Sequence, residues 1–202
     1  MSALLPTIYL IRHGETEWSR EGKHTGTTDL PLVHHGEVMA DALREWLAPL
    51  SFELVLTSPM RRARETCERA GLGENAVVCA DLSEWDYGDY EGRTSGEIRQ
   101  QAPGWNVYRD GSPGGETPAQ VARRADYLIA CLHKKRGNIA LFSHGQFGCA
   151  LAARSIGLAV VAGQHFALDA GSVSILGPKP GHPEMAAIIL WNGGPSAQPI
   201  RR

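Results

Sequence analysis

The chain has no large excess of charge of either sign. Its 20 lysines and arginines nearly balance 22 aspartates and glutamates, which gives a formal net charge of −2 over 202 residues. A protein that coats nucleic acid needs a basic excess to neutralise phosphates. The composition therefore predicts no nucleic-acid partner, and any anion site in the chain must be a local one.

Cysteines and long apolar runs are also scarce. The four cysteines, Cys67, Cys79, Cys131 and Cys149, show no Cys-x-x-Cys spacing, which disfavours a disulfide-built fold and a zinc ribbon. The apolar stretch 3–11 is too short to cross a membrane. It has no basic segment before it and no signal-peptide cleavage site after it, so we expect a buried strand. These absences favour a cytoplasmic protein with no membrane partner.

The rest of the composition is that of an ordinary globular protein, with 43% hydrophobic and 21% charged residues. Short apolar runs alternate with segments of helical spacing, which predicts parallel strands joined by helices. We expect an α/β fold, a three-layer sandwich whose mostly parallel central sheet is flanked by helices, as a single domain over 1–192 with a flexible C-terminal tail over 193–202. The expected strands are 8–11, 54–56, 76–79, 139–142, 166–168, 173–176 and 186–191, and the main helices are 36–47, 61–70, 146–156 and one that begins at a capping box in 117–120.

Two of the expected strands end in the same way, with Arg-His-Gly at 12–14 and Ser-His-Gly at 143–145. Ligands of open α/β sheets bind at the carboxyl ends of the strands, so His13 and His144 are expected to face one crevice. Each is followed by a glycine that lets backbone approach a ligand. Two unrelated structural histidines and a metal pair are the alternatives, but no metal-binding spacing is present and Arg12 would repel a cation.

Two further segments carry unusual charge. Arg61, Arg62 and Arg64 crowd the first turn of a helix, where the dipole is already positive, and a bound anion would relieve that conflict. The loop 82–92 mixes acids with aromatic residues, and a carboxyl group against aromatic walls has a raised pKa that suits a general acid. A solvated basic face and a solvated acidic loop are the respective alternatives.

Taken in order, five motifs of the chain resemble those of the histidine phosphatase superfamily, the phosphoglycerate-mutase-like group. The resemblance covers about 7–175, and within the group it is greatest to the sedoheptulose-bisphosphatase and broad acid-phosphatase branch. Ser19 departs from the asparagine that many relatives have. The five motifs are 12–18, 58–63, 84–92, 115–117 and 143–145, and the segments that resemble the branch are 24–32, 84–92 and 105–111.

The resemblance implies a role for each candidate residue. His13 would be the nucleophile that forms a phosphohistidine, and Arg12, Arg62 and His144 would surround the transferred phosphoryl group. Glu84 would protonate the leaving group and then activate water. No metal and no cofactor is needed, because protein groups carry the charge. The residues implied at the substrate end of the pocket are His24, Thr25, Trp85, Tyr87 and Gly145.

We therefore expect a metal-independent phosphatase that acts on a small phosphorylated metabolite, with sugar bisphosphates as the leading class. A cofactor-dependent phosphoglycerate mutase is one alternative, although 92–115 lacks the paired arginines and the insertion that mutases use to retain a second phosphate. A non-catalytic module that binds phosphorylated ligands is the other, although a binder has no use for both a nucleophile and an acid. The sequence leaves open whether the chain forms a homo-oligomer.

Overall fold

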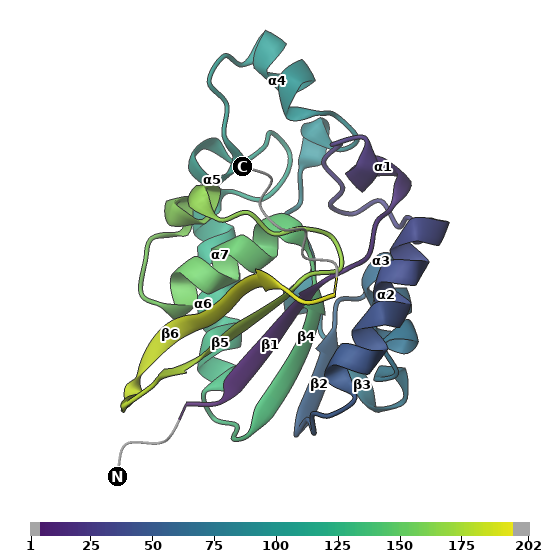
Figure 1. Ribbon diagram of the computed structural model, residues 1–202. Coiled ribbons are helices and arrows are strands. Elements are labelled where there is room, and N and C mark those ends of the chain that lie inside the picture. The colour runs from purple at the N-terminus through teal and green to yellow at the C-terminus, as the bar shows by residue number, and fades with distance from the viewer. Residues whose placement is uncertain (1–4, 196–202) are drawn as a thin grey trace, which may run out of the picture.

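The computed structural model describes residues 5–195, which contain one six-stranded sheet (Figure 1). Its strands lie in the order β3-β2-β4-β1-β5-β6. The first four run parallel to one another, and β5 and β6 are added antiparallel, so the predicted mostly parallel sheet is confirmed. The strands are β1 (Thr7–Arg12), β2 (Leu54–Thr57), β3 (Ala76–Val78), β4 (Asn138–Ser143), β5 (Val173–Lys179) and β6 (His182–Gly193).

Helices cover both faces of the sheet, which gives the three layers that the sequence predicts. Tyr9 and Ile11 of β1 join the apolar core that includes residues of α2 and α3, whereas Ile8 and Leu10 join the core that includes residues of α6 and α7. A strand buried on both faces is apolar at every position. The α-helices are α1 (Glu17–Arg20), α2 (His34–Leu47), α3 (Arg61–Arg69), α4 (Ser95–Gln101), α5 (Val107–Asp110), α6 (Pro118–Leu132) and α7 (Gly145–Ser155), and the 3₁₀ helices are η1 (Gly73–Asn75), η2 (Ala80–Leu82), η3 (Gly88–Tyr90) and η4 (Val160–His165).

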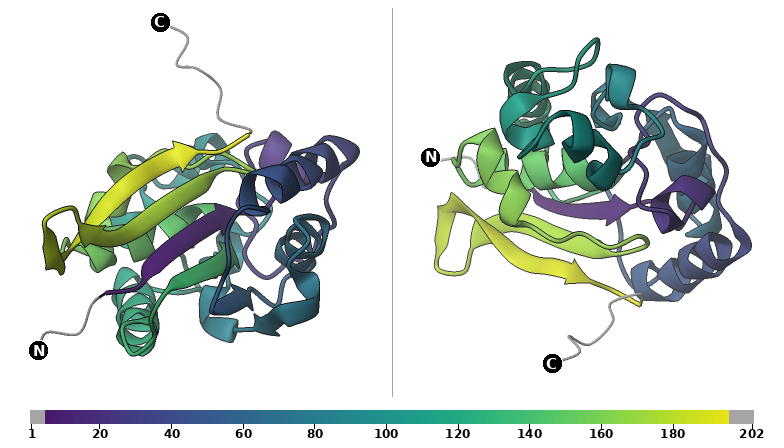
Figure 2. Two further views of the ribbon diagram at one scale, coloured as in Figure 1. Left: turned by 60° about the horizontal axis from the view of Figure 1, so that its bottom comes forward. Right: turned by 90° about the horizontal axis from the view of Figure 1, so that it is seen from above.

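The register of the central strands brings the two histidines together. In the pairing of β1 with β4, Arg12 lies opposite Ser143, so the residues that follow them, His13 and His144, leave the sheet side by side. Ser58 follows β2, the other neighbour of β4. The helices α1 and α4 lie beyond this end of the sheet (Figure 1), and β6, drawn in yellow, forms its far edge (Figure 2).

One predicted strand is absent. The apolar run 166–168 follows η4 and has no strand pairing; Phe166 packs on Trp191 with ring centres 5.1 Å apart, and the Leu168 carbonyl accepts a hydrogen bond from Arg12. Of the three residues only Leu168 is buried, and it is buried by side-chain packing without strand pairing, which is why the apolar character of the run misled the prediction. Of the expected tail, Gly193 ends β6, and 196–202 lies outside the described residues.

The four cysteines are free thiols. None of the helices within 5–195 combines the length and the apolar character that a bilayer span requires.

Candidate active site

A cavity of about 340 Å³ lies at the carboxyl end of β1 and β4. The side chains of Arg12 and His13 line it where β1 ends, and the loop between Lys23 and Thr25 lines the opposite part of its wall. Three of the ten predicted residues, Arg62, Trp85 and His144, are not on the wall. The predicted residues that line the cavity are Arg12, His13, His24, Thr25, Glu84, Tyr87 and Gly145.

The imidazole of His13 is held in one tautomer. Its Nδ1 lies 2.7 Å from the Gly14 carbonyl oxygen, and because a carbonyl only accepts hydrogen bonds, Nδ1 carries the proton and Nε2 keeps a free lone pair. Burial lowers the pKa of His13 well below its ordinary value, and the charges of Arg62 and Arg12 lower it further. A neutral ring with a free Nε2 is the form that can attack phosphorus.

Gly14 is required by a backbone contact. A Cβ at this position would lie 2.3 Å from the carbonyl oxygen of Gly36, and the Gly14 N–H donates to the Thr66 hydroxyl at 3.0 Å. The glycine after His13 therefore serves the packing of two chain segments, whereas the sequence suggested an approach to a ligand. Gly145, after His144, does line the cavity, and a Cβ there would lie 3.3 Å from the Arg12 guanidinium carbon.

Arg62 and His144 lie buried beside His13. The Arg62 guanidinium, fully buried, donates from Nε to His144 Nδ1 at 3.2 Å, and its two Nη atoms donate to carbonyls within 25–28 at 3.0 Å. Since Nδ1 of the neutral ring accepts, the proton of His144 is on Nε2, which lies 2.7 Å from the Ser58 hydroxyl. The rings of His13 and His144 meet edge to face, with centres 5.2 Å apart.

In the described part of the chain, neither Arg12 nor Arg62 is in direct contact with a carboxylate, although the charges of Glu84, Asp29 and Glu91 act on Arg62. Within 5–195, neither arginine belongs to an ion pair, and the buried Nε of Arg12 has no hydrogen-bond partner in this part of the chain. A buried donor without a partner costs about 1–3 kcal/mol, and a phosphate oxygen would remove that cost. In the same part of the chain, no three His, Cys, Asp or Glu side chains gather closely enough to hold a metal ion.

Glu84 is bound through both carboxylate oxygens to backbone N–H groups. Oε1 accepts from Trp85 at 2.9 Å and from Phe147 at 2.7 Å, and Oε2 accepts from Gln146 at 3.0 Å. The helix α7 has no acidic residue in its first turn, so Glu84 supplies the negative charge that a helix N-terminus favours. Oε2 accepts only one of these bonds and keeps a lone pair for a proton.

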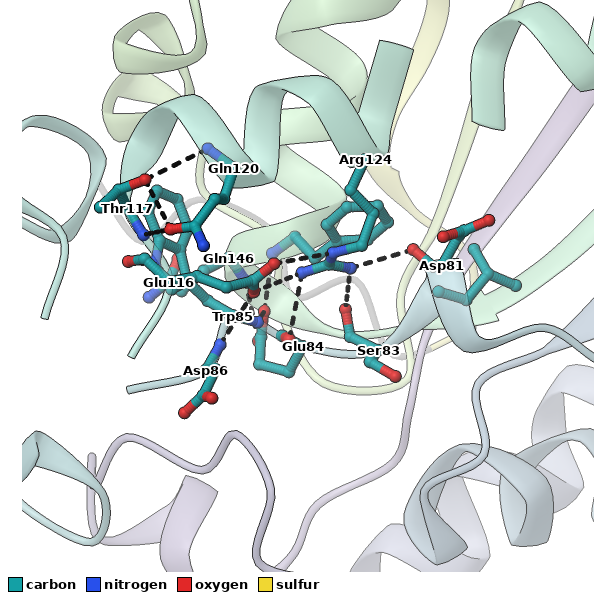
Figure 3. A network of polar contacts seen from close by, with 12 residues as sticks. Asp81, Ser83, Glu84, Trp85, Asp86, Glu116, Thr117, Gln120, Arg124 and Gln146 are labelled. Carbon is teal, nitrogen blue, oxygen red and sulfur yellow. Dashed lines mark hydrogen bonds and ion pairs between the residues drawn. The ribbon is translucent and has the colours of Figure 1, made fainter. Parts of the chain in front are cut away.

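The ion pair of Arg124 with Glu116 holds the loop that carries Glu84 (Figure 3). Arg124 on α6 binds the Glu116 carboxylate through Nε at 3.0 Å and Nη2 at 2.7 Å. The same guanidinium donates to the carbonyls of Asp81, Ser83 and Glu84 at 3.0, 2.7 and 3.3 Å. These five bonds tie the start of the acidic loop to α6 and to Glu116. No local pattern predicts them, because α6 lies about 40 residues further along the chain.

Trp85 lies in the core and does not line the cavity. Its side chain is fully buried, its indole N–H donates to the Glu116 carbonyl at 2.9 Å, and its ring meets Tyr108 edge to face with centres 5.5 Å apart. The family resemblance implied a place for Trp85 at the substrate end of the pocket, but the loop turns this side chain inward, where a carbonyl satisfies its one polar atom.

Two residues of the site were not singled out from the sequence. Ser58, which meets His144, opens the Ser-Pro motif, and Gln146, which lines the cavity and binds Glu84 through its N–H, follows the second His-Gly pair. Their positions next to recognised motifs were the available signals. Ser19, the residue that departs from the usual asparagine, also lines the cavity.

Comparisons with known proteins agree with this geometry. The model of the histidine phosphatase superfamily (branch 1) matches 8–190. An acid phosphatase of Mycobacterium tuberculosis is 39% identical over 96% of this chain and 95% of its own length. The sedoheptulose 1,7-bisphosphatase of Saccharomyces cerevisiae is 37% identical over 72% of this chain and 65% of its own. The solved structure of the open reading frame Rv3214 from M. tuberculosis superposes with a TM-score of 0.87 at 36% identity and covers 94% of this chain and 98% of that one. The chain belongs to the histidine phosphatase superfamily.

Proposed function

We propose that this chain hydrolyses small phosphomonoesters, sugar phosphates among them, through a phosphohistidine at His13 and without a metal ion. The observation that carries the proposal is the 2.7 Å contact of His13 Nδ1 with the Gly14 carbonyl, which leaves Nε2 unprotonated beside two unpaired arginines. The names of the relatives, an acid phosphatase and a sedoheptulose 1,7-bisphosphatase, support it. We place the reaction in the cytoplasm.

In the first step, His13 Nε2 attacks phosphorus while the bond from phosphorus to the ester oxygen breaks. Arg12 donates from its free Nε–H to a phosphoryl oxygen, and Arg62 adds positive potential beside it. His144, held between Arg62 and Ser58, lies against the ring of His13 on the same side of the phosphoryl group. Glu84 enters this step with a proton on Oε2 that it has taken from solvent, and the leaving oxygen takes that proton, so the alcohol departs neutral. The products of this step are the free alcohol, phosphohistidine and a Glu84 carboxylate.

In the second step, water attacks the phosphohistidine and the nitrogen–phosphorus bond breaks. The Glu84 carboxylate accepts the proton of the attacking water, and His13 recovers its lone pair as inorganic phosphate leaves. The enzyme thus returns to its starting protonation state, because the proton lost in the first step is regained in the second. Glu84 can exchange that proton because it lies on the cavity wall and only one backbone N–H binds Oε2.

The proposal is tested by trapping the phosphoenzyme. A sugar phosphate labelled on phosphorus is mixed with the protein, the reaction is stopped in base within milliseconds, and the label is mapped on the chain. We expect an acid-labile, base-stable label on His13, none in His13→Ala, and release as inorganic phosphate at the rate of turnover. A label that passes to a second organic acceptor would indicate a mutase, and binding of the ester without any label would indicate a binding module.

A further inference from the structure

The cavity at His13 continues into a second hollow of about 250 Å³. Both are lined by His24, Ser95, Gln146 and Phe166, so a ligand can extend from one into the other. The outer wall of the second hollow comes from α4, from the start of α5 and from η4. The helix α4 lies at the end of the molecule beyond the sheet (Figure 1). None of the roles assigned above uses this hollow.

Arg99 on α4 supplies positive charge to this hollow. Its Nε donates to the Trp105 carbonyl at 3.1 Å, which anchors the guanidinium, while its two Nη atoms make no hydrogen bond or ion pair to any residue within 5–195. The hollow has no aspartate or glutamate on its wall. An anchored guanidinium with both Nη groups free is the arrangement that binds a phosphate or carboxylate with two parallel bonds.

His24 lies on the wall of both cavities and is uncharged near neutral pH. Its ring lies against the ring of Tyr87, with centres 4.6 Å apart and planes inclined by 37°, and meets the ring of Trp105 edge to face with centres 5.3 Å apart. Its Nε2 lies 3.0 Å from the Ser95 hydroxyl. Burial lowers the pKa of His24 to about 4, with a further contribution from the charge of Arg99. Near neutral pH, Arg99 is therefore the one cation on the wall of the second hollow, and His24 offers a neutral surface for the middle of a ligand.

Neutral amide groups complete the wall opposite Arg99. Asn106 donates from Nδ2 to the Gln164 side-chain oxygen at 2.8 Å, and both residues line the hollow. This bond orients the Gln164 amide, whose Nε2 also lies 3.4 Å from His165 Nε2 and has a second N–H for a ligand. The hollow thus presents one cation, neutral donors and no competing acid, a set suited to an anionic group.

We propose that Arg99 binds a second phosphate of the substrate while the first phosphate is transferred to His13, so that the chain selects sugar bisphosphates over monophosphates. The proposal rests on the proposed function, since it assigns the far end of the same substrate. The sugar lies between the two ends, along His24 and Gln146, where neutral polar groups suit its hydroxyls.

Binding is measured first, because it does not depend on turnover. In the His13→Ala protein, fructose 1,6-bisphosphate, fructose 6-phosphate and 3-phosphoglycerate are titrated by calorimetry, with and without Arg99→Gln. We expect Arg99→Gln to raise the Kd of fructose 1,6-bisphosphate about tenfold or more, and the Kd of fructose 6-phosphate less than twofold. If Arg99→Gln weakened the binding of 3-phosphoglycerate but not that of the bisphosphate, the site would be one for a carboxylate. That result, an equal loss for every ligand, or no loss at all would overturn the proposal.

The same comparison is then made in the active enzyme. Arg99→Gln is expected to raise KM for fructose 1,6-bisphosphate about tenfold with little change in kcat, and to leave turnover of an aryl phosphate unchanged. Arg99→Lys should restore part of the loss, because an ammonium keeps the charge but not the paired bonds. Arg20→Gln, at an exposed arginine that lines neither cavity, is the matched control. Normal aryl phosphate turnover without selectivity for bisphosphates would overturn this inference alone, whereas absence of a phosphohistidine would overturn the proposed function.

Discussion

The guanidinium carbon of Arg124 lies 4.1 Å from the centre of the Phe147 ring. Phe147 in turn donates its backbone N–H to Oε1 of Glu84 at 2.7 Å, and Arg124 itself donates to the Glu84 carbonyl at 3.3 Å. One guanidinium therefore contacts both the backbone of the proposed acid and the helix turn that binds its carboxylate. Arg124 is a positioning residue that acts through Glu84.

Arg124→Gln is expected to slow phosphorylation of His13 by an alkyl phosphate about 10- to 100-fold, a part of the 10²- to 10⁴-fold that a general acid contributes. An aryl phosphate, whose leaving group hardly needs a proton, should lose less than threefold, a difference that a general loss of folding would not produce. Both rates are read from the pre-steady-state burst. Arg124→Lys should not rescue, because one ammonium cannot chelate Glu116 and also reach three carbonyls.

The matched control is Arg123→Gln, which changes an exposed arginine at the preceding position of the same helix. It should leave both burst rates unchanged. Equal losses for the alkyl and the aryl phosphate in Arg124→Gln would mean that Arg124 supports the fold in general and does not position Glu84.

Exhaustive chelation should leave activity unchanged, and vanadate should inhibit. The reason is that Arg12 and Arg62 supply positive charge beside His13 with no carboxylate paired to either of them within 5–195. Vanadate adopts the five-coordinate geometry of phosphoryl transfer and should therefore bind more tightly than phosphate. Steady-state turnover after dialysis against EDTA is the measurement. Loss of activity that zinc or magnesium restores would contradict the account.

The stability of the protein should fall below pH 6.5 through His24. The pKa of His24 is about 4 in the folded chain and about 6.5 when unfolded. Above pH 6.5, His24 is neutral in both the folded and the unfolded chain, and its contribution to the free energy of unfolding is complete. Between pH 6.5 and 4, His24 gains a proton in the unfolded chain before it does in the folded one, so this contribution is progressively lost. The loss over this window is on the order of 3 kcal/mol, at about 1.4 kcal/mol per pH unit.

The measurement is urea unfolding of the wild type and of His24→Gln at pH 7 and pH 4.5. The wild type should lose more free energy of unfolding than the variant over this interval, because glutamine takes up no proton in either state. Other buried histidines and the carboxylates contribute equally to both proteins and cancel in the difference. Parallel pH dependences would show that His24 is not held neutral by the fold.

The fold could be predicted where one local pattern sufficed. The continuous apolar runs at 8–11 and 139–142 predict strands covered on both faces, and the structure pairs them as β1 and β4. The adjacency of His13 and His144 follows from that pairing, because the carboxyl ends of neighbouring parallel strands lie at the same edge of the sheet. Where burial came from side-chain packing without strand pairing, as at 166–168, the same apolar signal failed.

The site was harder to predict wherever distant segments meet. Two of the three N–H groups that bind Glu84 come from α7, some 60 residues further along the chain, and the guanidinium that holds its loop comes from α6. Trp85 could not be placed for the same reason, because only the carbonyl of Glu116 decides that its indole turns inward. A sequence pattern shows which reactive side chains are present. The direction in which each side chain points depends on contacts with distant segments, which the pattern does not contain.

In the proposed mechanism, Glu84 protonates the group that leaves as His13 is phosphorylated. Expulsion of an alkoxide is difficult, because the pKa of its conjugate acid is close to that of water, about 15.7. A nitrophenolate is far less basic and needs little help. Glu84→Gln preserves the shape of the side chain but cannot donate a carboxyl proton.

The most direct measurement is the pre-steady-state burst of Glu84→Gln with a sugar phosphate and with a nitrophenyl phosphate. Steady-state rates would mix in the second step, where Glu84 also acts as the base. The account predicts a fast burst with the aryl substrate and a loss on the order of 10²-fold or more with the sugar phosphate. Equal losses in the two bursts would contradict it and would turn attention to Asp86 or Glu91 of the same loop as the acid.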